Sequence, residues 1–305
     1  MLHPTKRDLD LMTDTGELGI ADTLLLCLRH FGDAAQASIL RYSQRRLRTL
    51  ALSGLLECNK LAVNYSNGIK KLPTAFRLTE TGADLVEHIR GIRPRRPAKS
   101  EISPITLMHR LAVVKTRVAI DDAHVALGLP KPPWIMEADQ YEDREIKLAD
   151  PAERRFILRE SWGSGPSRIS ACPDASTLLT VPDETGEPRW LLAAYLEQDL
   201  STEGSAVANK AAGYAKLLDS ATNHYRRHWP HAHFARVLFV CPSQKRLENV
   251  ARLIVELPGS ENWRLAVNTA LLPPPAALTE PVWHDVHGNA MPIFPVVPAP
   301  REPAP

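Results

Sequence analysis

The sequence predicts an α+β protein in which a small domain of helices and a β-hairpin precedes a larger α/β sandwich. Two observations support this prediction. Apolar residues follow helical spacing and then a two-strand pattern within residues 1–90, whereas nearly continuous apolar strands alternate with helices further along. The length of 305 residues is enough for two such domains.

Charge is distributed unevenly along the chain, although its net value is only +2. Residues 1–99 carry 16 basic and 10 acidic side chains, and the remainder carries 21 and 25. This asymmetry favours a polyanionic partner for the first part, the alternative being a basic face that meets only solvent. The chain has no apolar run of membrane-spanning length and its four cysteines are widely spaced. We therefore expect a cytoplasmic protein with reduced thiols and no membrane partner.

The first domain, residues 1–90, is expected to begin with three helices. Leu9 and Met12 belong to the apolar stripe of the first helix, and residues 20–31 form a strongly apolar second helix. Ser43 is a candidate N-cap for the third helix, which is basic.

A hairpin and a closing helix complete this domain. After Gly54 the apolar period changes from helical to strand-like, and Ser66-Asn67-Gly68 is a strong hairpin signal. Thr79 is a candidate N-cap for a last helix that begins near Glu80. Three helices, a hairpin and a final helix are the order of a winged helix-turn-helix.

The third helix of this domain is the expected recognition helix. Its apolar residues share one face and its polar and basic residues another. Arginine can pair bidentately with guanine and glutamine with adenine, while lysines of the hairpin can hold phosphates. The alternative is a winged helix used for protein contacts. The candidate DNA-binding residues are Gln44, Arg45, Arg46 and Arg48 on the helix, and Lys60, Lys70 and Lys71 on the hairpin.

Three further segments follow the first domain. Residues 91–104 are rich in proline and arginine and predict an exposed basic linker. Residues 105–272 contain a long helix and then strand, strand, helix, strand and helix, which predicts the α/β sandwich. Residues 273–305 hold 10 of the 26 prolines and are expected to be a disordered or loosely draped tail.

Three carboxylates of the second domain form a candidate metal site. Glu197 and Asp199 end a predicted strand, and alternate strand residues point to the same face. If Asp174 neighbours them, the three would suit Mg²⁺, which can activate water for phosphodiester hydrolysis. Lys210 on the following helix could then steady negative charge in the same catalytic site. The alternative is an acidic strand end that pairs with nearby arginine and lysine.

Six groups of residues, in their order and spacing, carry a family resemblance. They are Arg7-Asp8 near the start; Arg45-Arg46-Leu47-Arg48-Thr49-Leu50 with Gly54-Leu55-Leu56; Phe76-Arg77-Leu78-Thr79-Glu80-Thr81-Gly82-Ala83; His109-Arg110-Leu111-Ala112-Val113; Pro173-Asp174-Ala175; and Leu196-Glu197-Gln198-Asp199-Leu200-Ser201-Thr202-Glu203 with Lys210 and Tyr214. Together they resemble the replication-relaxation family over roughly residues 5–255. The resemblance implies a winged-helix DNA-binding protein of a plasmid or mobile element, acting in replication, mobilisation or transcription control.

The second domain also resembles the PD-(D/E)XK nuclease fold. Pro173-Asp174 matches its first motif and Glu197-Gln198-Asp199 its second, with Asp199 where the pattern has a lysine, as in very-short-patch-repair-like nucleases. Lys210 is a candidate for a relocated lysine. The resemblance implies either a Mg²⁺-dependent endonuclease or a degenerate nuclease fold used for binding.

The primary prediction is a sequence-specific protein that binds double-stranded DNA, and the alternative is a Mg²⁺-dependent DNA endonuclease targeted by its winged helix. A third possibility is an adaptor whose acidic body recruits a relaxase or replication protein. The candidate partners are therefore duplex DNA, such a protein, and a second copy of the chain in a homodimer.

Overall fold

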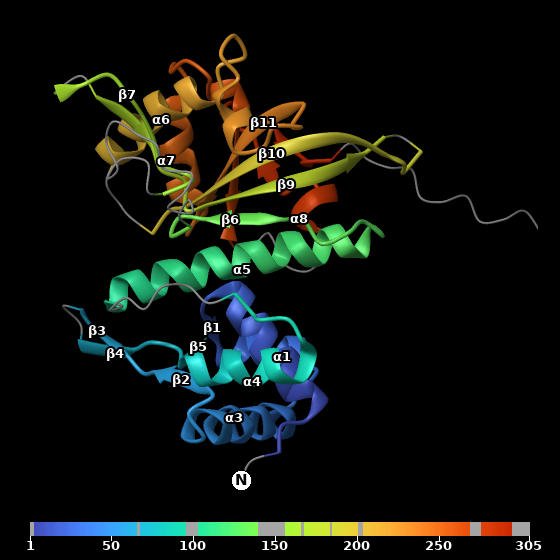
Figure 1. The fold of residues 1–305 in the computed structure, drawn as a ribbon. Helices are drawn as coiled ribbons and strands as arrows, with labels where there is room; N and C mark the ends of the chain where they lie inside the picture. The colour runs from blue at the N-terminus through green and yellow to red at the C-terminus, as the bar shows by residue number, and fades with distance from the viewer. Residues whose placement is uncertain are drawn as a thin grey trace, which may run out of the picture. The chain divides into compact units, whose positions relative to one another are not determined.

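A computed structural model describes eight stretches of the chain, and these fall into two compact units (Figure 1). The described residues are 3–65, 68–95, 103–139, 156–165, 168–183, 185–200, 204–268 and 276–294. The units are Met1–Lys115 and Thr116–Pro305, so the boundary lies within helix α5 (Pro104–Ala126). The sequence predicted a boundary before this helix; apolar residues continue along α5 without a break, so no local signal marks the division.

Three helices begin the first unit and supply much of its core. They are α1 (Lys6–Leu18), α2 (Thr23–His30) and α3 (Ala37–Leu52). Thr5 and Asp8 form a capping box at the start of α1, which satisfies backbone N–H groups that the helix leaves unpaired. Each helix turns apolar side chains inward, so that Leu11, Leu26 and Leu50 are fully buried.

The strands after α3 and the last helix follow in the order that the sequence predicts. They are β2 (Leu56–Asn59), β3 (Ala62–Tyr65), β4 (Gly68–Lys71), β5 (Ala75–Leu78) and α4 (Glu80–Arg90). A short strand that the sequence did not predict, β1 (Ala21–Asp22), precedes α2 within the range expected to be helical. β5 lies between β1 and β2 in one antiparallel sheet, and β3 pairs with β4. The side chain of Thr79 caps α4, as expected. The expected hairpin turn at Ser66 and Asn67 lies outside the described residues.

Helix α3 begins at Ala37 and not after Ser43, which differs from the predicted start. Ser43 is fully buried within the helix, and its hydroxyl donates a hydrogen bond to the carbonyl of Leu40 at 2.8 Å. The serine therefore satisfies its hydroxyl within its own turn and does not cap a new helix. Residues before it, including Arg41, consequently belong to the helix.

The predicted linker, residues 91–104, is attached to the first unit in its described part. Arg93 forms ion pairs with three acidic side chains of α4. A Cβ atom built on Gly16 of α1 would lie 2.6 Å from the carbonyl oxygen of Arg95, so only glycine allows this close approach. Residues 96–102 lie outside the described part of the chain.

A seven-stranded sheet organises the second unit. Its order is β14-β13-β12-β11-β10-β9-β6, and β10, β11 and β12 are parallel while the other neighbours are antiparallel. The strands are β6 (Trp134–Met136), β9 (Ala175–Pro182), β10 (Pro188–Gln198), β11 (Phe234–Cys241), β12 (Trp263–Val267), β13 (Trp283–His284) and β14 (Ala290–Met291). A separate pair is formed by β7 (Glu160–Trp162) and β8 (Ile169–Ala171).

Helices cover both faces of the large sheet. α6 (Gly204–Leu217) and α7 (Gln244–Ile254) share a buried cluster with Tyr195, Val237 and Trp263 on one face. Residues of α5 that belong to this unit face the other side, where Thr116 donates a hydrogen bond to the side chain of Gln198. The mixed α and β architecture is thus confirmed.

The predicted tail is partly folded, because residues 276–294 extend the sheet. α8 (Ala276–Thr279) precedes β13, which pairs with β12, and β14 pairs with β13. Trp283 and Phe294 are fully buried. Two aromatic anchors therefore outweigh the proline content that suggested disorder, while residues 273–275 and 295–305 lie outside the described chain.

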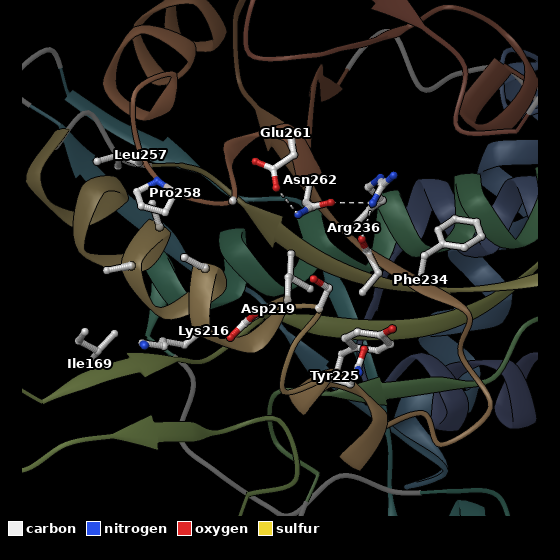
Figure 2. A pocket seen from close by; sticks show the side chains of 18 of the residues that line it. Ile169, Lys216, Asp219, Tyr225, Phe234, Arg236, Leu257, Pro258, Glu261 and Asn262 are labelled. Carbon is white, nitrogen blue, oxygen red and sulfur yellow. Dashed lines mark hydrogen bonds between the residues drawn. The ribbon is translucent and has the colours of Figure 1, made fainter.

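A cleft of about 860 Å³ opens in the second unit at the start of β11 (Figure 2). It is bordered by the end of α6, by the 3₁₀ turn η3 (His224–Arg227) and by η4 (Ser260–Asn262). Over the described residues, no helix is both long and apolar enough to cross a lipid bilayer.

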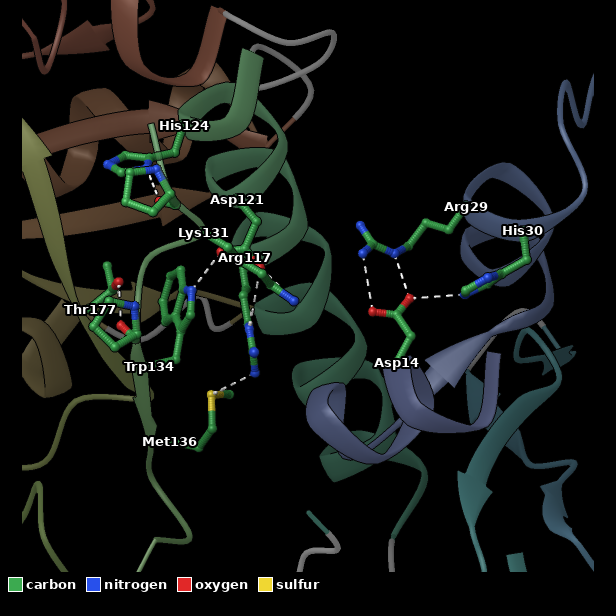
Figure 3. A network of polar contacts seen from close by, with 12 residues as sticks. Asp14, Arg29, His30, Arg117, Asp121, His124, Lys131, Trp134, Met136 and Thr177 are labelled. Carbon is green, nitrogen blue, oxygen red and sulfur yellow. Dashed lines mark hydrogen bonds and ion pairs between the residues drawn. The ribbon is translucent and has the colours of Figure 1, made fainter. Parts of the chain in front are cut away.

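Buried polar networks hold elements together within each unit (Figure 3). In the first, Asp14 of α1 accepts hydrogen bonds from Arg29 at 2.6 Å and from His30 at 3.1 Å. In the second, Asp121 of α5 accepts one from the indole of Trp134 at 2.7 Å. Burial favours the neutral form of Asp14, but the hydrogen bonds from His30 and Arg29 prevail and lower its pKa to about 2.

The pKa of Asp14 predicts a loss of stability in acid. A carboxyl whose folded pKa lies below its unfolded value of 3.8 stabilises the fold above about pH 4, and this contribution is lost as the pH falls towards 2. The shift corresponds to roughly 2 kcal/mol. In urea denaturation followed by circular dichroism, Asp14→Asn should be less stable than wild type at pH 7, with a smaller further loss between pH 4 and 2.

Asp10→Asn is the matched control, since Asp10 of the same helix is half-exposed in a surface pair with Arg90 and should contribute little. Parallel pH profiles for wild type and Asp14→Asn would contradict the assignment.

Candidate functional site

One face of α3 gathers exposed basic and polar side chains. Arg41, Arg45 and Arg48 are spaced i, i+4 and i+7, so they project from the same side of the helix, and Gln44 lies among them. All four are exposed, whereas Leu47 on the opposite side is fully buried. The sequence analysis did not predict Arg41, because the predicted helix start at Ser43 excludes it; its spacing of four residues from Arg45 was the available signal.

The arginines of this face have no ion-pair partner among the described residues, which distinguishes them from other arginines of the first unit. Those with carboxylate partners are Arg29, Arg46, Arg90 and Arg93. A free guanidinium keeps its donors available for a phosphate or a base edge. The α3 face, defined here as Arg41, Gln44, Arg45 and Arg48, is therefore the candidate nucleic-acid interface.

Arg46 does not belong to this face, which corrects its place among the predicted DNA-binding residues. Its Nε donates to Oδ1 of Asp8 at 2.8 Å and its Nη2 contacts Oδ2 of the same carboxylate. Asp8 is only 1% exposed, so this bidentate pair neutralises a buried charge. Burial favours the neutral form of Asp8, yet hydrogen bonds from Arg46 and Thr5 lower its pKa.

The hairpin places further lysines in the same unit. Lys60 and Lys71 are exposed, and the backbone of Lys70 pairs with Val63 across β3 and β4. The side chain of Lys70 lies outside the described part of the structure. A hydrogen bond from the amide of Leu72 to the carbonyl of Leu61, at 2.9 Å, continues the β2–β5 ladder into the β3–β4 hairpin, which extends past the three-stranded sheet (Figure 1).

The predicted carboxylates lie at one end of β10, and each has protein partners. Glu197 is almost fully buried, accepts a hydrogen bond from the hydroxyl of Tyr214 at 2.6 Å on Oε1, and contacts the ammonium group of Lys210 through Oε2. Oδ2 of Asp174 accepts from the amide of Gln198 at 2.7 Å.

Asp199 pairs with a residue of a different helix. Its carboxylate is 8% exposed and pairs with the guanidinium of Arg246, near the start of α7. The acid that stands at the lysine position of the nuclease pattern thus has its own buried cation. Arg246 was not predicted from the sequence, because nothing in the spacing of the two residues along the chain indicates that it lies beside Asp199.

Charge coupling links Glu197, Asp174 and Lys210. Burial and the neighbouring charge of Asp174 raise the pKa of Glu197 to about 7, against the opposing effects of Lys210 and Tyr214. Burial favours neutral Lys210, but Glu197 and Asp174 prevail and raise its pKa. The ammonium group is consequently the counterion of the carboxylate pair.

This arrangement does not fit a resident Mg²⁺ ion. Both oxygens of Glu197 already have a donor, and Lys210 brings its charge where a divalent cation would need to bind. Within the described stretches, no three histidine, cysteine, aspartate or glutamate side chains are grouped to hold a metal. Asp174, Glu197 and Asp199 therefore do not form the predicted metal site, because Asp199 pairs with Arg246 of α7 and Lys210 pairs with Glu197.

The sequence model of the family described as replication-relaxation matches residues 19–231. The chain belongs to the replication-relaxation family. The matched segment includes the α3 face, the hairpin and the Glu197–Lys210 pair, so these features lie within the part of the chain that the family shares. No curated protein matches the chain.

Two solved structures of the restriction endonuclease FokI show a weak likeness to this replication-relaxation protein. The DNA-bound structure has 12% identity and a TM-score of 0.25, covering 87% of this chain and 67% of FokI. A second FokI structure has 12% identity and a TM-score of 0.23, covering 87% of this chain and 68% of FokI. At these scores the likeness carries no argument about fold or activity.

The Glu197–Lys210 pair predicts a specific pattern of stability. Lys210→Met should lower the free energy of unfolding, because it removes the cation that pairs with a buried carboxylate. Adding Glu197→Gln should recover part of the loss. The deficit of the single variant should shrink as the pH falls below 7, since a protonated Glu197 needs no counterion. Urea denaturation at several pH values measures each difference.

Lys216→Met is the matched control, because Lys216 is exposed on the same helix. In the same experiment Mg²⁺ should leave the urea midpoint of the wild type unchanged. Stabilisation by Mg²⁺ that disappears in Glu197→Gln would contradict the assignment of Lys210 as the resident counterion.

Proposed function

We propose that this replication-relaxation protein binds double-stranded DNA sequence-specifically, with the first unit acting as a winged helix-turn-helix. The observation that carries the proposal is the α3 face, in which three exposed arginines, without ion pairs to any described residue, share one side of a helix with a glutamine. The process served is replication, mobilisation or transcription control of a plasmid or mobile element.

Helix α3 has the properties of a recognition helix. It follows α2 after a short connection, and its buried side, including Leu47 and Leu50, anchors it to the rest of the unit. A single helix fits the major groove, where Arg45 and Arg48 can pair bidentately with guanine and Gln44 with adenine. Arg41, one turn earlier, is then suited to a phosphate or a flanking base.

The β3–β4 hairpin is the proposed wing. Lysine side chains act as mobile point charges, which suit contact with phosphates more than discrimination between bases. Lys60, Lys70 and Lys71 are therefore assigned to affinity, and the α3 face to sequence choice.

Metal-dependent cleavage is not part of the proposal. Glu197 is paired with Lys210, and Asp199 is paired with Arg246. No described contact favours the endonuclease alternative over a binding role for the second unit.

Substitutions on α3 should separate binding from folding. In the full chain, Arg45→Ala or Arg48→Ala should relax discrimination at one base pair by about 1–3 kcal/mol while leaving the melting temperature close to that of the wild type, because both side chains are exposed and form no ion pair with a described residue. The measurement is fluorescence anisotropy with a duplex selected from a random library and its single-base variants.

Arg46→Ala is the internal control, since it should lose stability by leaving Asp8 buried without its cation. The proposal fails if Arg45→Ala and Arg48→Ala both retain wild-type affinity and discrimination.

Substitutions on the wing should act on all sequences alike. Lys70→Ala combined with Lys71→Ala should weaken selected and random duplexes by similar factors. The slope of log affinity against log salt should fall by about 0.9 for each phosphate that the wing no longer neutralises. Lys245→Ala, which removes one exposed positive charge from α7, is the control. A larger effect on the selected duplex than on the random one would overturn the assignment of the wing to phosphates.

A further inference from the structure

Two arginines of neighbouring strands lie on the same face of the large sheet. Arg236 is on β11, and Arg264 of β12 pairs in register with Leu238. Side chains two residues apart on a strand share a face, so Arg236, Leu238 and Arg264 point the same way. Val237 and Trp263, which alternate with them, point into the core beneath α6 and α7.

Both guanidinium groups are partly buried, and their protein partners are neutral oxygens. Arg236 donates to the carbonyl of Ala235 at 2.9 Å and to the side chain of Asn262 at 2.7 Å (Figure 2). Arg264 donates to the carbonyls of Glu261 at 2.9 Å and Trp263 at 2.7 Å. Neither forms an ion pair with a described carboxylate, which sets them apart from the paired arginines elsewhere in the protein.

The charges of these two arginines are desolvated and close enough to repel. Burial lowers the pKa of Arg236, and burial together with the charge of Arg236 lowers the pKa of Arg264. The nearby acids compensate only at a distance: Glu261 accepts a hydrogen bond from Asn262, and Asp285 is engaged by its own turn. An anion placed between the two cations would relieve this repulsion.

Donors remain for such an anion. Each guanidinium uses only Nη1 in its described hydrogen bonds, which leaves Nε and Nη2 without a hydrogen bond to a described residue. Arg236 also borders the cleft, so a ligand can approach it from outside.

The surroundings of the pair suit a nucleic acid. Trp190 is 40% exposed, Arg189 lies over its ring at 4.8 Å, and the imidazole of His233 packs edge-on against it at 5.7 Å. His233 borders the same cleft as Arg236. Arg189 thus adds exposed positive charge near the cleft, and clustered basic residues are typical of surfaces that bind a phosphate backbone.

We propose that Arg236 and Arg264 together bind a phosphodiester group of DNA, giving the second unit a DNA contact of its own. The inference rests on the proposed function in that the full chain must bind DNA, but it concerns residues that take no part in the winged helix. Arginine suits this role because its planar fork can present two parallel donors to phosphate oxygens.

The test compares three forms of the full chain with the wild type by fluorescence anisotropy, using duplex DNA at several salt concentrations. Arg236→Gln combined with Arg264→Gln should reduce the slope of log affinity against log salt by about 0.9, the value for one neutralised phosphate. Arg236→Lys combined with Arg264→Lys retains both charges and should keep most of the wild-type slope. Arg252→Gln, which removes an exposed charge from α7, should leave the slope unchanged.

A second measurement uses the wild type, so that misfolding of the glutamine variant cannot obscure the result. Arg236 and Arg264 should react with an arginine-selective dicarbonyl such as phenylglyoxal in the free protein and be protected by saturating duplex DNA, while Arg252 reacts equally in both states. Mass spectrometry of the digested protein reads each site.

The outcomes separate this inference from the proposed function. An unchanged slope in the glutamine variant, or reactivity of both arginines that DNA does not reduce, overturns the second contact even when α3 variants lose binding. A wild-type chain without salt-dependent DNA binding overturns both.

Discussion

Buried carboxylates constrain both units, because an ionised acid removed from water must have a cation nearby. Asp8, Asp14, Glu197 and Asp199 are all largely buried, and each is matched by an arginine or lysine from another element. These pairs connect α1 to α3 and to α2 in the first unit, and the end of β10 to α6 and to α7 in the second. They therefore position the elements that carry the functional surfaces.

Pairing with buried carboxylates divides the arginines into two groups with different roles. An arginine bound to a buried acid contributes to folding, and its donors are already used. Arg46 belongs to this class, although its neighbours Arg45 and Arg48 do not. On α3 and at the start of β11 and β12, arginines without a carboxylate partner among the described residues keep their positive charge available to a polyanion. In a protein with a net charge of only +2, this selective pairing leaves usable charge grouped at these two places.

Much of the first unit could be predicted from the sequence, because its signals are local. Helical spacing, the cap at Thr79 and the strand period all lie within short windows. The helix start at Ala37 could not, since Ser43 has the chemistry of a cap and only its tertiary burial rules that role out.

The carboxylate site was harder to predict, because the partner of each carboxylate can lie far away in the sequence. The sequence placed Lys210, on the helix that follows the strand, in the same site as Glu197, and the two side chains are in contact. It could not show that Arg246 would take Asp199, or that Asp8, a residue of the first helix, would take Arg46 from the third. Pairing between remote residues is decided by packing, which the order of residues does not display.

The short strands after β12 have a further consequence for how the chain can be divided. The family match ends at residue 231, yet the sheet that contains β10 extends beyond it through β11, β12, β13 and β14. A protein shortened at residue 272 would leave one side of β12 as an open edge, with backbone N–H and C=O groups free to pair with another chain. Residues 276–294, including the buried Trp283, thus act as an edge guard against self-association, and a soluble fragment of the second unit has to retain them.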